Sequence, residues 1–195
     1  MSLLPAAILA GGRSSRMGGG DKCLLRLGRM SLLDRIIGVL AAQTDPILIN
    51  SNSIPDLFDR TSLEVRADAI AGRLGPLAGI VTAMLWARER CAPIVSTVPS
   101  DTPFLPYNLA ARLLEPCGGR RIAVASNDLH LHPTIGVWPV MLAERLLDDI
   151  ECGVRSVYSW LMNKPFDTVP FEANGIDPFF NINTPSDREQ ANAGL

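Results

Sequence analysis

The sequence predicts an α/β fold with a mainly parallel central sheet, and two observations predict it. Short apolar runs typical of buried strands alternate with longer segments of helical periodicity. The 195 residues are 47% hydrophobic and 19% charged, which is typical of a compact globular protein. A strand followed by a helix, repeated, implies right-handed crossovers and a sheet covered on both faces. We expect one domain over residues 1–195, since no linker, repeat or charge block divides the chain.

The elements follow in order along the chain. Five strands are expected at residues 6–9, 47–49, 63–66, 94–98 and 122–125, and helices at 32–40, 77–90 and 107–114. Ser31 and Asp34 have the spacing of a capping box before the first of these helices. Further strands are expected at 133–140 and 166–170, and helices at 141–150 and 154–162. Residues 184–187, Thr-Pro-Ser-Asp, are typical of a helix start.

The charge balance excludes a protein that binds nucleic acid through a broad basic surface. The formal net charge is −2, although residues 1–35 hold six Lys and Arg and only two Asp and Glu. No apolar run approaches the roughly 20 residues that cross a bilayer, and no signal peptide begins the sequence. We expect a cytoplasmic protein with no membrane partner. The four cysteines form no C-x-x-C pair, which argues against a zinc ribbon and predicts reduced, mostly packed thiols.

A glycine-rich loop with three cations follows the first strand. Leu9, Ala10, Gly11 and Gly12 lead into a segment that contains Arg16, Gly18, Gly19 and Gly20 and ends at Lys22. Glycines allow successive backbone N–H groups to converge on an anion, and cations add charge-assisted contacts. The spacing fits neither a Walker A loop nor a dinucleotide fingerprint. The loop therefore predicts a phosphate site of another kind, with a surface loop as the alternative.

This segment resembles the opening of a known superfamily. L-A-G-G-x-x-x-R-M-G-x-x-x-K, over residues 9–22, is similar to the nucleotidyltransferases, and most of all to the molybdenum cofactor guanylyltransferases of the MobA type. Later elements resemble that family in the same order: G-P-L-A-G at 75–79, D-T-P-F-L-P at 101–106, H-P at 132–133 and N-I-N-T-P at 181–185. Cys23 stands where the family commonly has glycine, and both residues are small. The resemblance covers nearly the whole chain and implies a three-layer Rossmann-like nucleotidyltransferase fold.

The resemblance implies a set of nucleotide-binding and catalytic residues. Catalysis falls to Arg16, Lys22 and Asp101, and the nucleotide would be bound by Leu9, Ala10, Gly11, Gly12, Lys22, Asn50, Asp68, Gly75, Pro76, Leu77, Gly79 and Asp101. Backbone groups of residues 75–79 could meet a flat base with Leu77 packed beside it. Asp68 could instead be an exposed strand end.

A magnesium ion is the expected cofactor. Asp101 directly follows a predicted strand, and Mg²⁺ needs only one or two carboxylates besides phosphate oxygens and water. By resemblance Asn183 is the second metal contact. The alternatives are a turn-forming role for Asp101 and a helix-start role for Asn183, and for Asn183 both roles can hold.

The implied reaction transfers GMP from GTP to the phosphate of molybdopterin, releasing pyrophosphate. Residues 1–106 would mainly bind the nucleotide and 107–195 the acceptor, through His132, Pro133 and Asn181. Proteins that deliver the cofactor or mature molybdoenzymes are the implied protein partners. The alternatives are a cytidylyltransferase or sugar-phosphate nucleotidyltransferase of this fold, or a nucleotide-binding adaptor without turnover.

Overall fold

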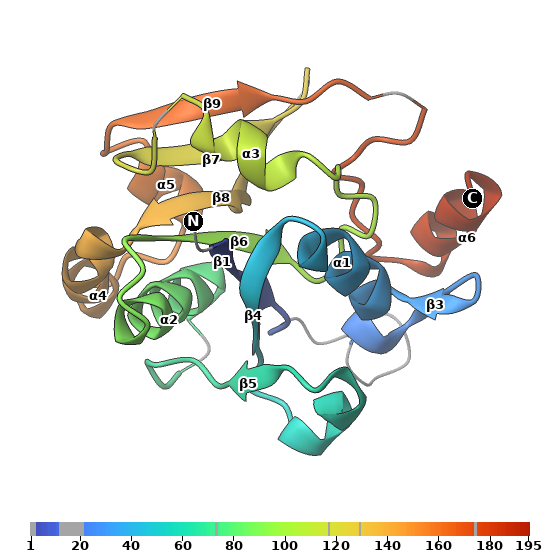
Figure 1. Cartoon of the computed structure of the whole chain (residues 1–195), viewed down its shortest axis with the longest axis horizontal. Coiled ribbons are helices and arrows are strands. Elements are labelled where there is room, and N and C mark those ends of the chain that lie inside the picture. Colours follow the sequence, from blue (N-terminus) through green and yellow to red (C-terminus); the bar gives the residue numbers. More distant parts are fainter. Residues whose placement is uncertain (1–2, 12–21, 73, 117, 129, 174) are drawn as a thin grey trace.

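A seven-stranded sheet forms the centre of the molecule (Figure 1). The structure is a computed structural model and describes residues 3–11, 22–72, 74–116, 118–128, 130–173 and 175–195. The strand order of the sheet is β5-β4-β1-β6-β8-β7-β9. The strands are β1 (Leu4–Leu9), β4 (Thr44–Asn50), β5 (Glu64–Arg66), β6 (Ile94–Pro99), β7 (Ile122–Ser126), β8 (Leu131–Pro139) and β9 (Phe166–Pro170). β5 and β9 lie at opposite edges of the sheet (Figure 1).

The sheet is mainly parallel, as the sequence predicts. All neighbouring strands run parallel except β8, which is antiparallel to both β6 and β7. The strand order reverses between β1 and β6, because β4 and β5 extend the sheet on one side of β1 and β6 extends it on the other. Ligands bind at such a switch point, beyond the carboxyl ends of the strands.

Six helices and three short 3₁₀ helices complete the described chain. The helices are α1 (Leu32–Ala41), α2 (Pro76–Glu89), α3 (Leu109–Leu114), α4 (Ala143–Glu151), α5 (Val157–Leu161) and α6 (Pro185–Ala193). The 3₁₀ helices are η1 (Lys22–Leu24), η2 (Pro55–Thr61) and η3 (Val140–Leu142). The predicted capping box at Ser31 with Asp34 is present, and the predicted helix start at 184–187 is a second capping box, formed by Thr184 with Asp187. No helix among these described residues is long and apolar enough to cross a membrane.

Some boundaries differ from the sequence prediction. α5 begins at Val157 rather than 154, because Ser156 caps it by accepting a hydrogen bond from the backbone N–H of Ser159. The segment expected to be helical from 141 starts as η3, and α4 begins at Ala143. A two-stranded hairpin, β2 (Arg26–Leu27) with β3 (Met30–Ser31), has too few residues for a periodic pattern and was not predicted.

The core lies on both faces of the sheet, because side chains alternate along each strand. In β1, Ala6 and Ile8 face the cluster that contains α1 and α3, whereas Ala7 and Leu9 face the cluster that contains α2, α4 and α5. The expectation that the cysteines are mostly packed is wrong for Cys91 and Cys152, which are exposed. Neither lies on a strand or a buried helix face.

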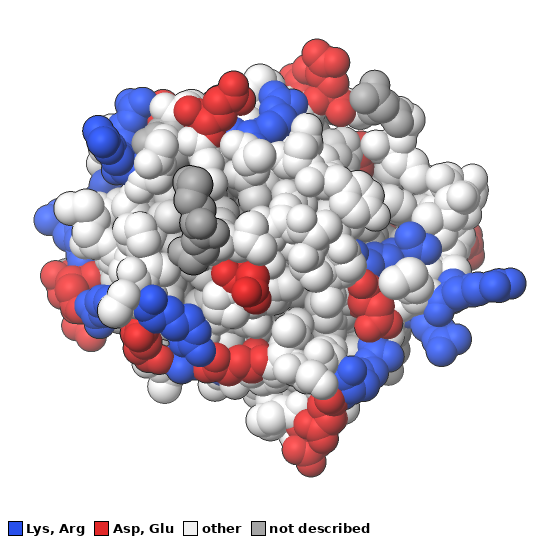
Figure 2. All heavy atoms as spheres, viewed as in Figure 1, with Lys and Arg blue, Asp and Glu red and all other residues white. Residues whose placement is uncertain are grey.

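Charged side chains of both signs are interspersed around the rim of the face shown in Figure 2. The centre of this face is largely uncharged, and the described residues form no continuous basic area on it. This distribution agrees with the near-neutral net charge.

Candidate active site

Three predicted site residues from distant parts of the chain meet at the carboxyl edge of the sheet. The Lys22 ammonium lies 2.6 Å from Asp101 Oδ2 and also donates a hydrogen bond to Asn183 Oδ1. Lys22 lies in η1, Asp101 follows β6, and Asn183 precedes α6. Lys22 is 8% exposed, so its charge is largely withdrawn from water and paired inside the protein.

The backbone holds Asp101 and Asn183 together. The N–H of Ile182 donates to the carbonyl of Asp101 at 3.0 Å, which ties the segment before α6 to the loop after β6. Thr184, not Asn183, is the N-cap of α6, so the Asn183 side chain can face Lys22 while the helix start is capped by its neighbour. Asn183 is therefore not the cap of α6, and its role as a metal contact stays a prediction.

Asp187 is a site-supporting residue that the sequence reasoning missed. Its Oδ2 accepts from the backbone N–H of Asn183 at 2.8 Å and from that of Thr184 at 2.7 Å. Burial alone raises the pKa of Asp187, but these hydrogen bonds and the nearby Lys22 charge outweigh burial and lower it. The capping-box spacing of Thr184 and Asp187 was visible in the sequence. The additional hydrogen bond that Asp187 accepts from the backbone N–H of Asn183 was not.

A second group lies where β1 and β4 end. Leu9 and Asn50 are paired in register, and Asn50 is 2% exposed. Asn50 Nδ2 donates to Asp68 Oδ1 at 3.1 Å. A Cβ on Gly79 would lie 2.5 Å from Asn50 Oδ1 and 3.0 Å from Leu9 Cδ2, so only glycine lets α2 approach this closely. The structure thus brings together four of the residues implied for the nucleotide site: Leu9, Asn50, Asp68 and Gly79.

Asn52 belongs to this group and was not singled out from the sequence. Its Nδ2 donates to Asp68 Oδ2 at 2.7 Å, and its Oδ1 accepts from the Asp68 backbone N–H at 2.9 Å. Asn52 therefore fixes both the side chain and the backbone of Asp68. The polar run that follows β4, Ser-Asn-Ser at 51–53, was the available signal.

The G-P-L-A-G motif at residues 75–79 forms the start of α2 with the backbone conformation that such a turn needs, although the Leu77 side chain lies elsewhere than expected. Gly75 is the N-cap residue with φ +80°, a conformation that favours glycine, and Pro76 occupies the first helical position. Leu77 is fully buried in the core beneath α2, so its side chain anchors the helix and offers no exposed surface to a base. The expectation that Leu77 packs beside the base is corrected, because its side chain faces the sheet.

The predicted acceptor residues lie around the other strands. The His132 ring, at the start of β8, lies 4.6 Å from the Phe179 ring, and its Nε2 has no hydrogen-bond partner among the described residues. Burial lowers the pKa of His132, which favours the neutral imidazole near pH 7. Pro133 follows in the same strand, and Asn181 is exposed two residues after Phe179. Gly12 and Arg16 lie outside the described residues.

The donor set beside Lys22 suits a hard cation. Asp101 offers a carboxylate and Asn183 a carbonyl oxygen, and both oxygens already face one positive group. Oxygen ligands of this kind bind Mg²⁺ and Mn²⁺. Among the described residues there is no cluster of three His, Cys, Asp or Glu that could hold a metal on its own, so further ligands would come from substrate phosphates and water.

Fold and site together define a class. A sheet of this topology, with a lysine, a carboxylate and an amide gathered at its switch point, is the arrangement of a nucleotide-dependent transferase. The chain belongs to the family of the MobA-like NTP transferase domain, whose model matches residues 6–164. It is accordingly a nucleotidyltransferase, which confirms the resemblance seen in the sequence.

Individual relatives cover almost the full chain. A molybdenum cofactor guanylyltransferase of Rhizobium meliloti (strain 1021) is 44% identical over 204 residues, which span 98% of this chain and 91% of the relative. The crystal structure of molybdopterin-guanine dinucleotide biosynthesis protein A from Archaeoglobus fulgidus has a TM-score of 0.75 at 21% identity, covering 97% of both chains. A Mycobacterium tuberculosis protein in complex with manganese has a TM-score of 0.72 at 15% identity, covering 100% of both chains. These two structures confirm the fold class.

Proposed function

We propose that this protein transfers the guanylyl group of GTP to the terminal phosphate of molybdopterin and releases pyrophosphate. The observation that carries the proposal is the full-length similarity to molybdenum cofactor guanylyltransferases, joined to a site with the groups this reaction needs. GTP and molybdopterin are the small-molecule partners, and the product would pass to cofactor-delivery or molybdoenzyme-maturation proteins in the cytoplasm.

The chemistry needs alignment and charge neutralisation more than a base. A phosphate oxygen of molybdopterin attacks the α-phosphorus of GTP, one P–O bond forms, and the bond to the β-phosphate oxygen breaks with pyrophosphate leaving. An ionised phosphate is already a nucleophile at neutral pH, so the neutral His132 need not remove a proton. Lys22 is a cation at the place where negative charge gathers, and Arg16 of the glycine loop would add a second.

Magnesium is the proposed metal, held by Asp101 and Asn183 together with phosphate oxygens. When bound it would neutralise charge on the transferred and departing phosphates. Lys22 contacts the same two oxygens, so its ammonium and the metal would compete for them. Asp187 holds the Asn183 backbone by accepting a hydrogen bond from its N–H.

The two parts of the chain divide the substrates. We assign the nucleotide to residues 1–106, with the base at the group formed by Leu9, Asn50, Asp68 and Gly79, where the partly exposed Asp68 carboxylate can accept hydrogen bonds from a base edge. The acceptor falls to residues 107–195, near His132, Pro133 and Asn181. The pairing of β6 with β8 in the same sheet supports our assignment of both parts to one domain.

Product identification tests the proposal. The protein is incubated with Mg²⁺, each of GTP, CTP, ATP and UTP, and molybdopterin in metal-free and molybdenum-loaded forms. We expect pyrophosphate release and a guanine dinucleotide product with GTP, and a loss of about 100-fold or more in turnover for Asp101→Ala. Preferred use of CTP, or GTP binding without turnover on either acceptor, contradicts the proposal.

A further inference from the structure

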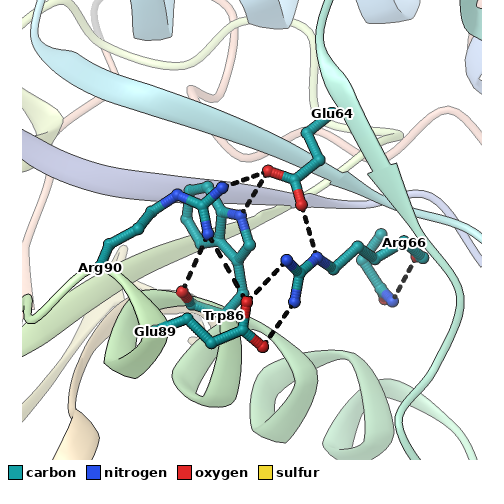
Figure 3. Close-up of polar contacts among 6 residues, drawn as sticks. Glu64, Arg66, Trp86, Glu89 and Arg90 are labelled. Atoms are coloured by element: carbon teal, nitrogen blue, oxygen red, sulfur yellow. Dashed lines mark hydrogen bonds and ion pairs between the residues drawn. The ribbon is translucent and has the colours of Figure 1, made fainter.

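A network of charged side chains holds the edge strand β5 against α2. Arg66 Nε lies 2.6 Å from Glu64 Oε1, and Arg66 Nη2 lies 2.7 Å from Glu89 Oε2. The buried indole of Trp86 donates to Glu64 Oε2 at 3.0 Å. Arg90 also pairs with Glu64, and its guanidinium lies 4.5 Å from the centroid of the Trp86 ring. Figure 3 shows the two β5 residues facing Trp86 and Glu89 of α2 and Arg90, the C-cap residue of that helix.

The network has features that isolated surface pairs lack. An exposed ion pair contributes about 0–1 kcal/mol, because solvent screens it and its side chains lose freedom. Here Glu64 accepts from three donors, and Arg66 bridges two carboxylates with its planar fork. The hydrogen bond that Arg66 donates to Glu89 is the leading cause that lowers the pKa of Glu89 and the leading cause that raises the pKa of Arg66. Burial alone raises the pKa of Glu64, but its hydrogen bonds and the nearby arginines outweigh burial and lower it, so Glu64, Arg66 and Glu89 are charged near neutral pH.

The strand that this network holds needs such support. β5 has three residues and lies at the edge of the sheet, paired with β4 on one side. A short edge strand has few ladder hydrogen bonds to fix its position. Contacts with α2 give β5 the support that a second neighbouring strand would otherwise provide.

The backbone of Arg66 connects the network to the four residues assigned to the nucleotide base, Leu9, Asn50, Asp68 and Gly79, which we call the base group. The Arg66 carbonyl accepts from the Ser51 N–H at 2.8 Å and from Asn50 Nδ2 at 3.2 Å. Asn50 Nδ2 also donates to Asp68, which lies two residues beyond Arg66. A shift of Arg66 therefore moves the partners of Asn50 and the chain that carries Asp68.

The same helix touches the base group at its other end. Gly79, in the first turns of α2, is in close approach to Asn50, whereas Trp86 and Glu89 lie in its last turns and Arg90 is its C-cap. One rigid helix thus sets the position of Asn50 directly and that of Asp68 through β5.

We propose that Arg66, with Glu64 and Glu89, is a positioning residue that sets the geometry of Asn50 and Asp68 and so determines how the base is selected. The inference rests on the proposed function in one respect, because it takes the base group as the site that binds the nucleotide base. Network and phosphate-binding residues occupy different parts of the chain. Weakening the network should therefore impair recognition of the base while leaving recognition of the phosphates intact.

The test compares two arginine-to-methionine variants on the full chain. Arg66→Met removes the guanidinium but keeps the aliphatic stem and the backbone carbonyl. Arg88→Met is the matched control, since Arg88 lies on α2 and pairs with the exposed Glu144, away from β5. Calorimetry without acceptor measures the Kd for GTP and for inorganic tripolyphosphate, and the melting temperature is recorded for each variant.

We expect Arg66→Met to raise the Kd for GTP about tenfold and to narrow its preference over the other nucleotides, as for other residues that couple indirectly to a site. Tripolyphosphate affinity should stay within about twofold, and Arg88→Met should match the unmodified protein. Arg66→Lys keeps the charge without the fork and should give an intermediate Kd for GTP.

Each other outcome has a definite meaning. An unchanged GTP affinity in Arg66→Met, or an equal loss of GTP and tripolyphosphate, overturns the positioning role. If Arg66→Met fails to fold, Glu89→Gln, which keeps an acceptor, carries the same expectation in weaker form. If the unmodified protein prefers a nucleotide other than GTP, the proposed function fails, and the positioning role is judged on that preferred nucleotide.

Discussion

Single atoms decide whether the base group can form. Asn50 is almost fully buried, and its side-chain oxygen lies where a Cβ of residue 79 would be. The contact is possible only because α2 carries glycine at this position, and a helix normally loses about 1 kcal/mol for an interior glycine. The helix therefore gives up stability at Gly79 for a close approach to the edge of the sheet.

A glycine-to-alanine pair tests this at the residue scale. Gly79→Ala should raise the Kd for GTP about tenfold or more, because the new Cβ displaces Asn50 or Leu9. Gly38→Ala is the matched control: Gly38 lies inside α1, is exposed, and has no atom within 4 Å of an added Cβ. That change should leave GTP binding unaltered and stabilise the protein by about 0.5–1 kcal/mol. Equal GTP affinity in both variants contradicts the steric reading of Gly79.

Residues differ in how far the sequence reveals them. Asp101 was predictable because it directly follows an apolar strand, and such residues emerge at the ligand edge of a sheet. Asn52 and Asp187 were not, because they act through Asp68 and Asn183 and their partners are set by the path of the loops. Leu77 was predicted from a motif, but a motif position does not say whether the side chain faces the ligand or the core, and here it faces the core.

At the scale of elements, sequence patterns predict the structure correctly where its hydrogen bonds join residues that are close in the chain. Both capping boxes join residues three apart and were visible as spacing. The hairpin of β2 with β3 is also local, but its two-residue strands are too short to show a periodic pattern. The antiparallel direction of β8 depends on partners elsewhere in the chain, so no window of sequence carries it. The same holds for α6, which packs beside β2 only because the chain returns there (Figure 1).

The two capping boxes allow a matched test of what α6 does for the site. Thr184→Ala and Ser31→Ala should each cost about 1 kcal/mol of unfolding free energy, the usual value for an N-cap. Turnover should fall further in Thr184→Ala, because α6 begins next to Asn183 and its Asp187 holds the Asn183 backbone. Thermal unfolding and pyrophosphate release measure the two effects. Equal turnover in both variants contradicts a role for the α6 cap in placing Asn183.

The pH dependence of stability tests Asp187 at the same scale. Its folded pKa is lowered, so its contribution is fully present above the unfolded value of about 3.9 and is lost as pH falls through the folded value. The unfolding free energy of the unmodified protein minus that of Asp187→Asn should therefore be constant from about pH 7 to 5 and shrink below about pH 4. A difference that grows in acid contradicts the assignment.

At the scale of the whole molecule, the fold joins three distant segments around one charge. Lys22 is 79 positions from Asp101 and 161 from Asn183, so the site exists only when η1, the loop after β6 and the segment before α6 are assembled. The near-neutral net charge conceals this arrangement, in which Lys22 of the basic first 35 residues meets Asp101 of the acidic remainder at the carboxyl edge. The topology rule predicted that meeting place, whereas the Asn183 contact depends on the bond between Ile182 and Asp101.

This arrangement makes lysine and metal competitors for the same two oxygens, and Lys22→Met tests it. Mn²⁺ binding without nucleotide, followed by electron paramagnetic resonance, should be about tenfold tighter in Lys22→Met, because no ammonium holds Asp101 and Asn183. GTP-dependent turnover should fall in the same variant, since the cation is lost from the phosphates. Lys164→Met is the control, because Lys164 pairs with Asp149 instead, 3.4 Å away. Unchanged or weaker Mn²⁺ affinity in Lys22→Met would mean that the ammonium supports the metal site rather than filling it.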